Sequence, residues 1–300
     1  MIFPQGRDDF SIAAEQSTST VIGLSWSPSG LARFRRSVLA VLTSNLVLSL
    51  WEPVGEKGQW ARVSIINHAL HPNPDLPSEL EGMALRRANI RSFSWCSPLR
   101  LPARTNGSNE PPEPESRWGA HMLTVANDAN EIKMVQVRRA SAGHSTGQSY
   151  HVEILATQPL GENEEQFPHA CPGSLLRTAL QSKTRATSIS CGPWIALEDQ
   201  EHVYSATCVI AALYGTQLRF IKATAALGES DSERKLIPRY EITAELRDHP
   251  LVGSDSKWTH RRITGPLQWL HSVCGSHRLR KRCLLTTGNH RSSPQLLRLQ

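Results

Sequence analysis

Residues 21–70 read VIGLSWSPSGLARFRRSVLAVLTSNLVLSLWEPVGEKGQWARVSIINHAL and contain four short apolar runs separated by turns or polar insertions. The runs are Val21–Pro28, Ser37–Thr43, Leu46–Glu52 and Trp60–Leu70. Short runs of this kind, bounded by turn residues and partly alternating between apolar and polar side chains, are typical of antiparallel strands. The stretch therefore predicts one small sheet of four strands.

The same plan returns further along the chain. The second copy consists of Ile90–Pro98, His121–Ala126, Glu131–Val137 and Tyr150–Ala156. The third consists of Ala186–Trp194, Tyr204–Leu213, Gln217–Lys222 and Arg239–Leu246. A fourth begins at Arg262, continues at Cys283–Asn289 and then stops. A unit that cannot bury its own apolar face folds by stacking on its copies. The repeat predicts an all-β, WD40-like β-propeller with blades over residues 21–70, 90–156, 186–246 and, incompletely, 262–300.

This count amounts to about three and a third blades, whereas propellers close on roughly four to eight. We therefore expect an incomplete ring, whose remaining part is either missing or supplied by a partner. We also expect the chain expressed alone to be prone to aggregation, because unpaired strand edges template association. Within the blades, the alternation over Ile132–Val137 predicts a half-buried strand. The insertion at 102–116, PARTNGSNEPPEPES, is rich in proline and acid and predicts a disordered loop.

Tryptophans stand at repeated positions of the predicted blades. Trp26, Trp95 and Trp269 each end a first strand, and Trp51, followed by Glu52, ends a third strand where propeller repeats often carry Trp-Asp. Because an aromatic side chain contributes a large buried area, we expect these residues to pack inside blades rather than to bind ligands. The turn residues assigned to the same structural set are Pro28, Gly30 and Pro98.

The net charge of +6 is unevenly placed. Residues 276–300 contain six basic residues and no acid, and the rest of the chain holds equal numbers of both signs. Such a cluster is typical of a phosphate contact or a nuclear import signal, and equally of a solvated end or the flank of a strand. The candidate residues are Arg278, Arg280, Lys281 and Arg282.

Nucleotide-binding motifs are missing from the sequence. It contains no G-x-G-x-x-G and no G-x-x-x-x-G-K-[ST] pattern. His68 and His71 form an H-x-x-H pair without the further ligands that a metal site needs. The six cysteines stand singly, which favours reduced thiols. We expect no enzyme activity, cofactor, metal or small-molecule substrate. We also expect an intracellular protein without a membrane partner, because neither a signal peptide nor an apolar run of about 20 residues is present.

Ser141 is a candidate phosphorylation site. It follows Arg138-Arg139-Ala140, the pattern that basic-directed kinases favour, in a predicted polar loop. A phosphate there would pair with the arginines and alter contacts with partners. Such short patterns also arise by chance, so the alternative is an accessible serine without a role.

Residues 10–51 resemble one particular propeller family. The characteristic residues are Glu15-Gln16, the turn Trp26–Leu31, the pair Arg35-Arg36 and the run Val38–Leu50. The segment is similar to the N-terminal propeller of the ninety-kilodalton (delta) subunit of transcription factor IIIC in its fungal form. The family's opening blade and zinc-binding C-terminal region have no counterpart here, so the resemblance implies a truncated member or an incomplete gene model.

The resemblance implies a noncatalytic scaffold subunit in the nucleus. Its partners would be the other transcription factor IIIC subunits, with DNA contacted mainly through the complex, in support of RNA polymerase III transcription of tRNA and related genes. The alternative is an unrelated WD40-type interaction module, such as a trafficking protein or a ubiquitin ligase adaptor. Weaker alternatives are direct DNA binding through the basic tail and the acetyltransferase activity associated with animal relatives of the family.

Overall fold

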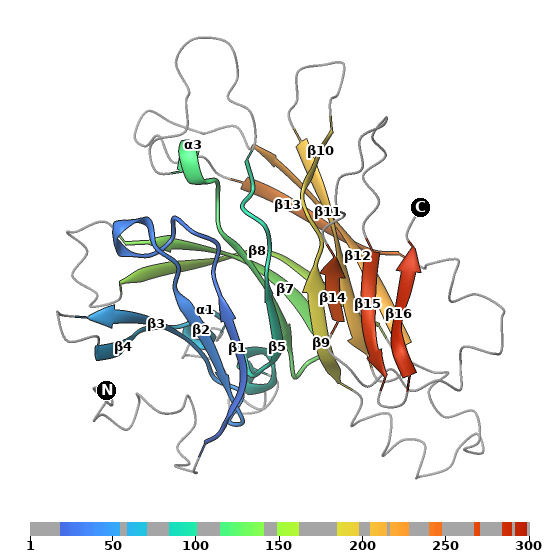
Figure 1. Cartoon of the computed structure of the whole chain (residues 1–300), viewed down its shortest axis with the longest axis horizontal. Helices are drawn as coiled ribbons and strands as arrows, with labels where there is room; N and C mark the ends of the chain where they lie inside the picture. The colour runs from blue at the N-terminus through green and yellow to red at the C-terminus, as the bar shows by residue number, and fades with distance from the viewer. Residues whose placement is uncertain are drawn as a thin grey trace.

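The fold is built from small antiparallel sheets that stand side by side, as the computed structural model shows (Figure 1). The structure describes residues 19–54, 59–70, 84–100, 115–140, 149–161, 185–197, 205–214, 217–227, 240–247, 267–270, 284–289 and 292–298. The first strands of successive sheets, β1, β5, β9 and β14, are spatial neighbours in chain order. This stacking of sheets through their first strands confirms the predicted β-propeller class, and we call the sheets blades 1 to 4.

Blade 1 has the strand order β1-β2-β3-β4. Its strands are β1 (Val21–Trp26), β2 (Leu39–Thr43), β3 (Leu48–Val54) and β4 (Gln59–Ile65). The prediction that the last strand continues to Leu70 is wrong, because Asn67–Leu70 form the short helix α1. The reason is the buried Asn67 side chain, whose Oδ1 accepts the Leu48 N–H (2.7 Å) and whose Nδ2 donates to Leu46 O (2.9 Å) and Ala88 O (2.7 Å).

Blade 2 repeats this order with β5 (Ile90–Trp95), β6 (Met122–Asn127), β7 (Glu131–Arg139) and β8 (Tyr150–Pro159). The helical segment 84–88 precedes it, and helix α3 (Glu115–Trp118) lies between β5 and β6. Because α3 begins at Glu115, the last two residues of the predicted loop 102–116 are helical. Residues 102–114 of that loop lie outside the described residues.

Blade 3 contains β9 (Ala186–Cys191), β10 (Ile195–Leu197), β11 (Ser205–Tyr214), β12 (Gln217–Leu227) and β13 (Tyr240–Arg247). Both β9 and β10 pair with β11, at opposite ends of that long strand. Strands β11, β12 and β13 then follow as an antiparallel meander. The predicted first segment, Ala186–Trp194, therefore contains β9, and β10 is a further short strand that follows it and was not predicted.

Blade 4 has three strands in its described part, β14 (Leu267–Leu270), β15 (Leu284–Asn289) and β16 (Ser292–Arg298). The expectation that this blade stops after Asn289 is wrong, because β16 pairs with β15. Pro294 argues against a strand when only the sequence is considered, because proline has no N–H to donate to a neighbouring strand. In the structure it falls where the register between β15 and β16 shifts, between the Thr287–Gln295 and Asn289–Ser292 pairs.

The middle strands of blade 2, β6 and β7, are buried on both faces, and this explains their apolar sequence. Along β6, Leu123 and Val125 join a core shared with blade 1, whereas Met122 and Ala126 join a core shared with blade 3. Along β7, every residue from Ile132 to Val137 is buried. The prediction of a half-buried strand at 132–137 is therefore wrong. Successive side chains of a strand point to opposite faces, and here each face meets a neighbouring blade.

Serine hydroxyls connect the first strands of blades 2 and 3. The backbone N–H groups of Ile189, Cys191 and Trp194 donate to the Oγ atoms of Ser92 (3.1 Å), Ser94 (3.2 Å) and Ser97 (3.3 Å). Each pair is separated by 97 residues, so the two segments run parallel and in register. These three hydrogen bonds therefore hold blade 3 against blade 2 in one defined alignment.

Candidate interaction surfaces

The side of blade 1 that faces away from blade 2 exposes apolar side chains. Ile22, Leu24 and Trp26 alternate along β1 and are 54%, 62% and 55% exposed. The prediction that Trp26 is buried inside a blade is therefore wrong. Gly23 faces blade 2 instead: a Cβ there would lie 3.3 Å from the ring of Phe93, so β1 and β5 approach closely. The sequence does not reveal which face of β1 meets the neighbouring blade.

Trp26 lies against a second tryptophan on this open side. Its ring centroid is 5.8 Å from that of Trp60 on β4, with the ring planes tilted by 54°. This geometry suits an aromatic pair. The tryptophans, together with Ile22, Leu24 and the exposed Val21, form what we call the β1 surface. An exposed apolar group of this kind is typical of a protein contact.

The predicted turn residue Gly30 lies where blade 1 meets α3 of blade 2, and Pro28 precedes it in the same turn. Gly30 has φ of +107°, and a Cβ there would lie 2.7 Å from the Cβ of Trp118, so glycine is required for two reasons. The buried His121 reinforces this contact by donating from Nε2 to Ser29 O (3.0 Å). Burial lowers the pKa of His121, against the smaller opposite effect of that hydrogen bond.

Trp51 is half-buried on β3, and its indole N–H donates to Ser49 Oγ (2.9 Å). The following residue, Glu52, is buried and joins the two blades. Its carboxylate accepts the Arg33 N–H (3.2 Å) and the hydroxyl of Tyr150, the first residue of β8. Burial, and then the hydrogen bond and charge of Glu52, raise the pKa of Tyr150 far above its usual value.

The remaining predicted residues fall into two groups. Trp95 packs against the core between blades 1 and 2, and Pro98 lies beside Gly119 in the connection from β5 to α3. Trp269 is placed on β14, opposite Leu285 of β15. Ser141 and the basic cluster Arg278, Arg280, Lys281 and Arg282 lie outside the described residues.

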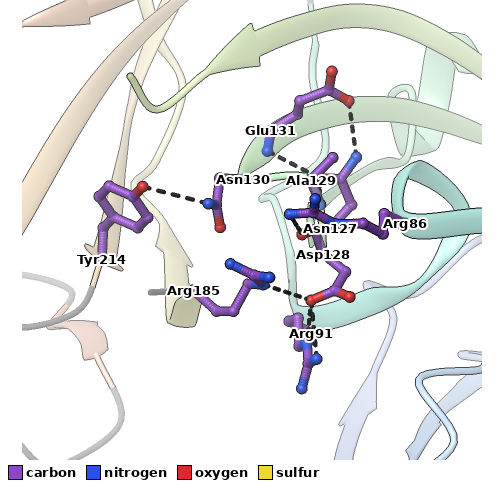
Figure 2. A network of polar contacts seen from close by, with 9 residues as sticks. All are labelled: Arg86, Arg91, Asn127, Asp128, Ala129, Asn130, Glu131, Arg185 and Tyr214. Carbon is purple, nitrogen blue, oxygen red and sulfur yellow. Dashed lines mark hydrogen bonds and ion pairs between the residues drawn. The ribbon is translucent and has the colours of Figure 1, made fainter. Parts of the chain in front are cut away.

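A polar network missed by the sequence analysis occupies the turn between β6 and β7 (Figure 2). The buried Asn127 organises this turn: its Oδ1 accepts the N–H groups of Ala129 (3.1 Å) and Glu131 (2.9 Å), and its Nδ2 donates to Glu131 Oε2 (2.9 Å). An asparagine that binds the backbone two residues ahead is a recurrent turn device. The turn is therefore fixed by its own side chains.

The same turn holds blade 3 through Asp128. Its Oδ1 accepts Arg91 Nη2 (2.9 Å) and Arg185 Nε (2.7 Å), the latter from the residue just before β9 (Figure 2). Beside it, Asn130 Nδ2 donates to the hydroxyl of Tyr214 on β11 (3.3 Å). The carboxylate is thus engaged by arginines of two blades. The network therefore joins blades 2 and 3, and the Asp128 carboxylate is paired within it.

Three thiols meet between blades 2 and 3, again unforeseen from the sequence. The Sγ atoms of Cys96 and Cys191 lie 2.7 Å apart, and Thr124 Oγ1 lies 3.3 Å and 3.1 Å from them. Cys208 of β11 also hydrogen-bonds to Cys191. All three cysteines are free thiols.

The three thiols differ in pKa. Burial, followed by its contacts with Cys191, raises the pKa of Cys96; for Cys208 the hydrogen bond to Cys191 comes first and burial second. At Cys191 the raising effect of burial is outweighed by hydrogen bonds from Cys208, Cys96 and Thr124, so its pKa is lowered. Cys191 is thus the thiol of the cluster that ionises first.

Among the described residues, no group of three or more His, Cys, Asp or Glu side chains is arranged to hold a metal ion. His68, one of the H-x-x-H pair, is exposed on α1, and His71 lies outside the described part of the chain. None of the described helices is long and apolar enough to cross a membrane.

Comparison with known proteins identifies the family. No curated protein matches the chain. The family model described as the transcription factor IIIC subunit delta beta-propeller domain matches residues 1–297, which is nearly the whole sequence. The match agrees with the stacked antiparallel sheets and extends the resemblance of residues 10–51 to the later blades. The chain therefore belongs to the transcription factor IIIC subunit delta beta-propeller family.

Proposed function

We propose that this protein is a noncatalytic assembly subunit of transcription factor IIIC that acts in the nucleus. In this role it supports initiation by RNA polymerase III at tRNA and related genes, and it meets DNA mainly through its partner subunits. The observation that carries the proposal is the family match over residues 1–297. The fold supports a role in assembly, because stacked blades offer several rigid surfaces to partners.

The β1 surface supports a protein partner in particular. Ile22, Leu24 and Trp26 place three large apolar side chains on one open strand. Aromatic and large apolar residues are enriched at the centres of protein interfaces, where they supply much of the binding energy. We propose that another subunit of the factor covers this strand.

Affinity purification from nuclear extract tests the proposal. A tagged form of the chain should copurify with the other transcription factor IIIC subunits. Leu24→Asp should weaken this recovery without lowering the melting temperature, because Leu24 is exposed. Ile195→Asp is the matched control: it replaces an exposed apolar residue of blade 3 and should leave recovery unchanged. Cytoplasmic trafficking proteins or a ubiquitin ligase in place of these subunits would contradict the proposal.

A further inference from the structure

A second surface, at the end of blades 1 and 2 where β1 and β5 finish, is strongly basic. Three arginines belong to the loop between β1 and β2, and two belong to the connection between β5 and β6. All five are exposed, and we call them the arginine surface: Arg33, Arg35, Arg36, Arg100 and Arg117.

Contacts between the two blades make this surface continuous. Gly30 N donates to Arg35 O (3.0 Å), and the Gly30 backbone packs against Trp118, the neighbour of Arg117. On the other side, a Cβ on Gly119 would lie 2.9 Å from Arg100 Cγ. The arginines therefore lie on one patch that spans the boundary between blades 1 and 2, rather than on separate loops.

The five arginines of this surface form no ion pair with any carboxylate in the described part of the chain. Arginines elsewhere do: Arg87 pairs with Glu131 (3.2 Å) and Arg138 with Glu153 (3.0 Å). Glu52 meets Arg33 only through the backbone N–H and also accepts the hydroxyl of Tyr150.

An exposed aromatic ring stands among these arginines. Phe34 is 78% exposed, and the Arg33 guanidinium carbon lies 5.1 Å from its ring centroid. Arg117 is placed in the same way over Trp118, at 5.6 Å. An arginine over an aromatic face keeps its N–H edges available to an anion.

The backbone that presents Phe34 is strained. Phe34 and Arg35 have φ of +56° and +59°, a conformation that bulky residues rarely adopt. Hydrogen bonds from Ala32 N to Arg36 O (2.9 Å) and from Arg36 N to Arg33 O (3.3 Å) hold the loop in this form. Strain of this kind persists where the surrounding structure imposes it, and it is concentrated at functional sites.

We propose that the arginine surface binds a single-stranded nucleic acid. Guanidinium groups contact the phosphates, and the ring of Phe34 stacks on an unpaired base. Proteins that bind single strands combine these two elements, a basic track and an accessible aromatic face. An acidic protein segment would match the charges but would supply no planar base for the ring. The proposal uses a surface other than the β1 surface, so it stands or falls independently of the assembly role.

Fluorescence anisotropy of labelled DNA and RNA strands with the full chain tests the proposal. Affinity should fall as salt rises, since each phosphate contact contributes about 0.7 to the slope of log affinity against log salt. Changing Arg33, Arg35 and Arg36 to alanine should reduce this slope by about 2. Arg87→Ala should leave it unchanged, because Arg87 is paired at the opposite end of blade 2.

A second variant tests the aromatic contact separately. Phe34→Asn removes the ring and suits a positive φ, so the loop should keep its form. It should weaken binding of a single strand at least about fivefold, and binding of a duplex much less. The proposal is overturned if neither DNA nor RNA strands bind, if the triple variant binds with the slope of the parent, if Phe34→Asn has no effect, or if a polyglutamate peptide binds more tightly than either strand.

Discussion

Cys96 and Cys191, 95 residues apart in the sequence, face each other across the boundary between blades 2 and 3 with their sulfur atoms 2.7 Å apart. Each follows or ends the first strand of its blade, and Thr124 of β6 contacts both. Their position makes the thiols sensitive reporters of whether the two blades are stacked in solution.

The order of alkylation of these thiols provides the first prediction. Cys191 should react with iodoacetamide before the others at neutral pH, because its pKa is lowered and its side chain is only partly buried. Cys96 and Cys208 should react only as the pH rises above the usual thiol range, since a raised pKa keeps them protonated. Mass spectrometry of modified peptides across pH measures this order. Equal rates for all three thiols in the folded protein would contradict it, with the urea-unfolded chain as the control.

Removal of the hydroxyl between blades 1 and 2 gives the second prediction. Tyr150→Phe deletes the hydrogen bond to the buried Glu52 and should lower the free energy of unfolding by about 1.5 to 3 kcal/mol, the range for a bond to a charged group. Urea unfolding measures the loss. A double-mutant cycle with Glu52→Gln should show that the two changes are not additive. Additive losses would mean that the side chains act separately.

Two tryptophans at the same position of successive blades should respond differently to truncation. Trp26→Ala should cost about 1 kcal/mol or less, because Trp26 is exposed and loses mainly its contact with Trp60. Trp95→Ala should cost about 2 to 3 kcal/mol, because Trp95 packs against the core between blades 1 and 2. Thermal unfolding of both variants decides the point. A larger loss at Trp26 than at Trp95 would show that β1 is covered.

Deletion of the acidic insertion provides the fourth prediction. Removing residues 103–112 and joining the ends with a short Gly-Ser linker should leave the melting temperature unchanged, because the sequence there is poor in apolar residues. A deletion that also removes Glu115 and Ser116 should lower the melting temperature. It shortens α3, which positions Trp118 against Gly30. Loss of soluble protein in the shorter deletion would contradict the interpretation.

Local sequence patterns predicted the strands well but not their surroundings. The first strands at Val21, Ile90 and Ala186 begin where the apolar runs begin, because alternation and turn residues act over a few positions. Burial depends on neighbours instead. Trp26 and Trp95 occupy the same place in their blades, yet only Trp95 joins the core between blades 1 and 2.

The contacts between blades depend on how one copy aligns with the next, and the sequence of a single copy does not contain this information. The hydrogen bonds from β9 to the serines of blade 2 all span 97 residues, which is close to the spacing between the starts of the second and third copies. Aligning the copies would therefore have placed Cys191 near Cys96. The arrangement of Asp128 between Arg91 and Arg185 had no such signal, because Arg91 lies within β5 whereas Arg185 precedes β9, so the two arginines do not occupy equivalent positions of their copies.

Occupancy of genes by the tagged protein tests the central claim most directly. Chromatin immunoprecipitation should recover tRNA genes and related RNA polymerase III genes together with the other transcription factor IIIC subunits, as expected for a member of this propeller family. Leu24→Asp should reduce this recovery, and Ile195→Asp should not. Recovery of tRNA genes no greater than that of genes transcribed by other polymerases would contradict a role in transcription factor IIIC.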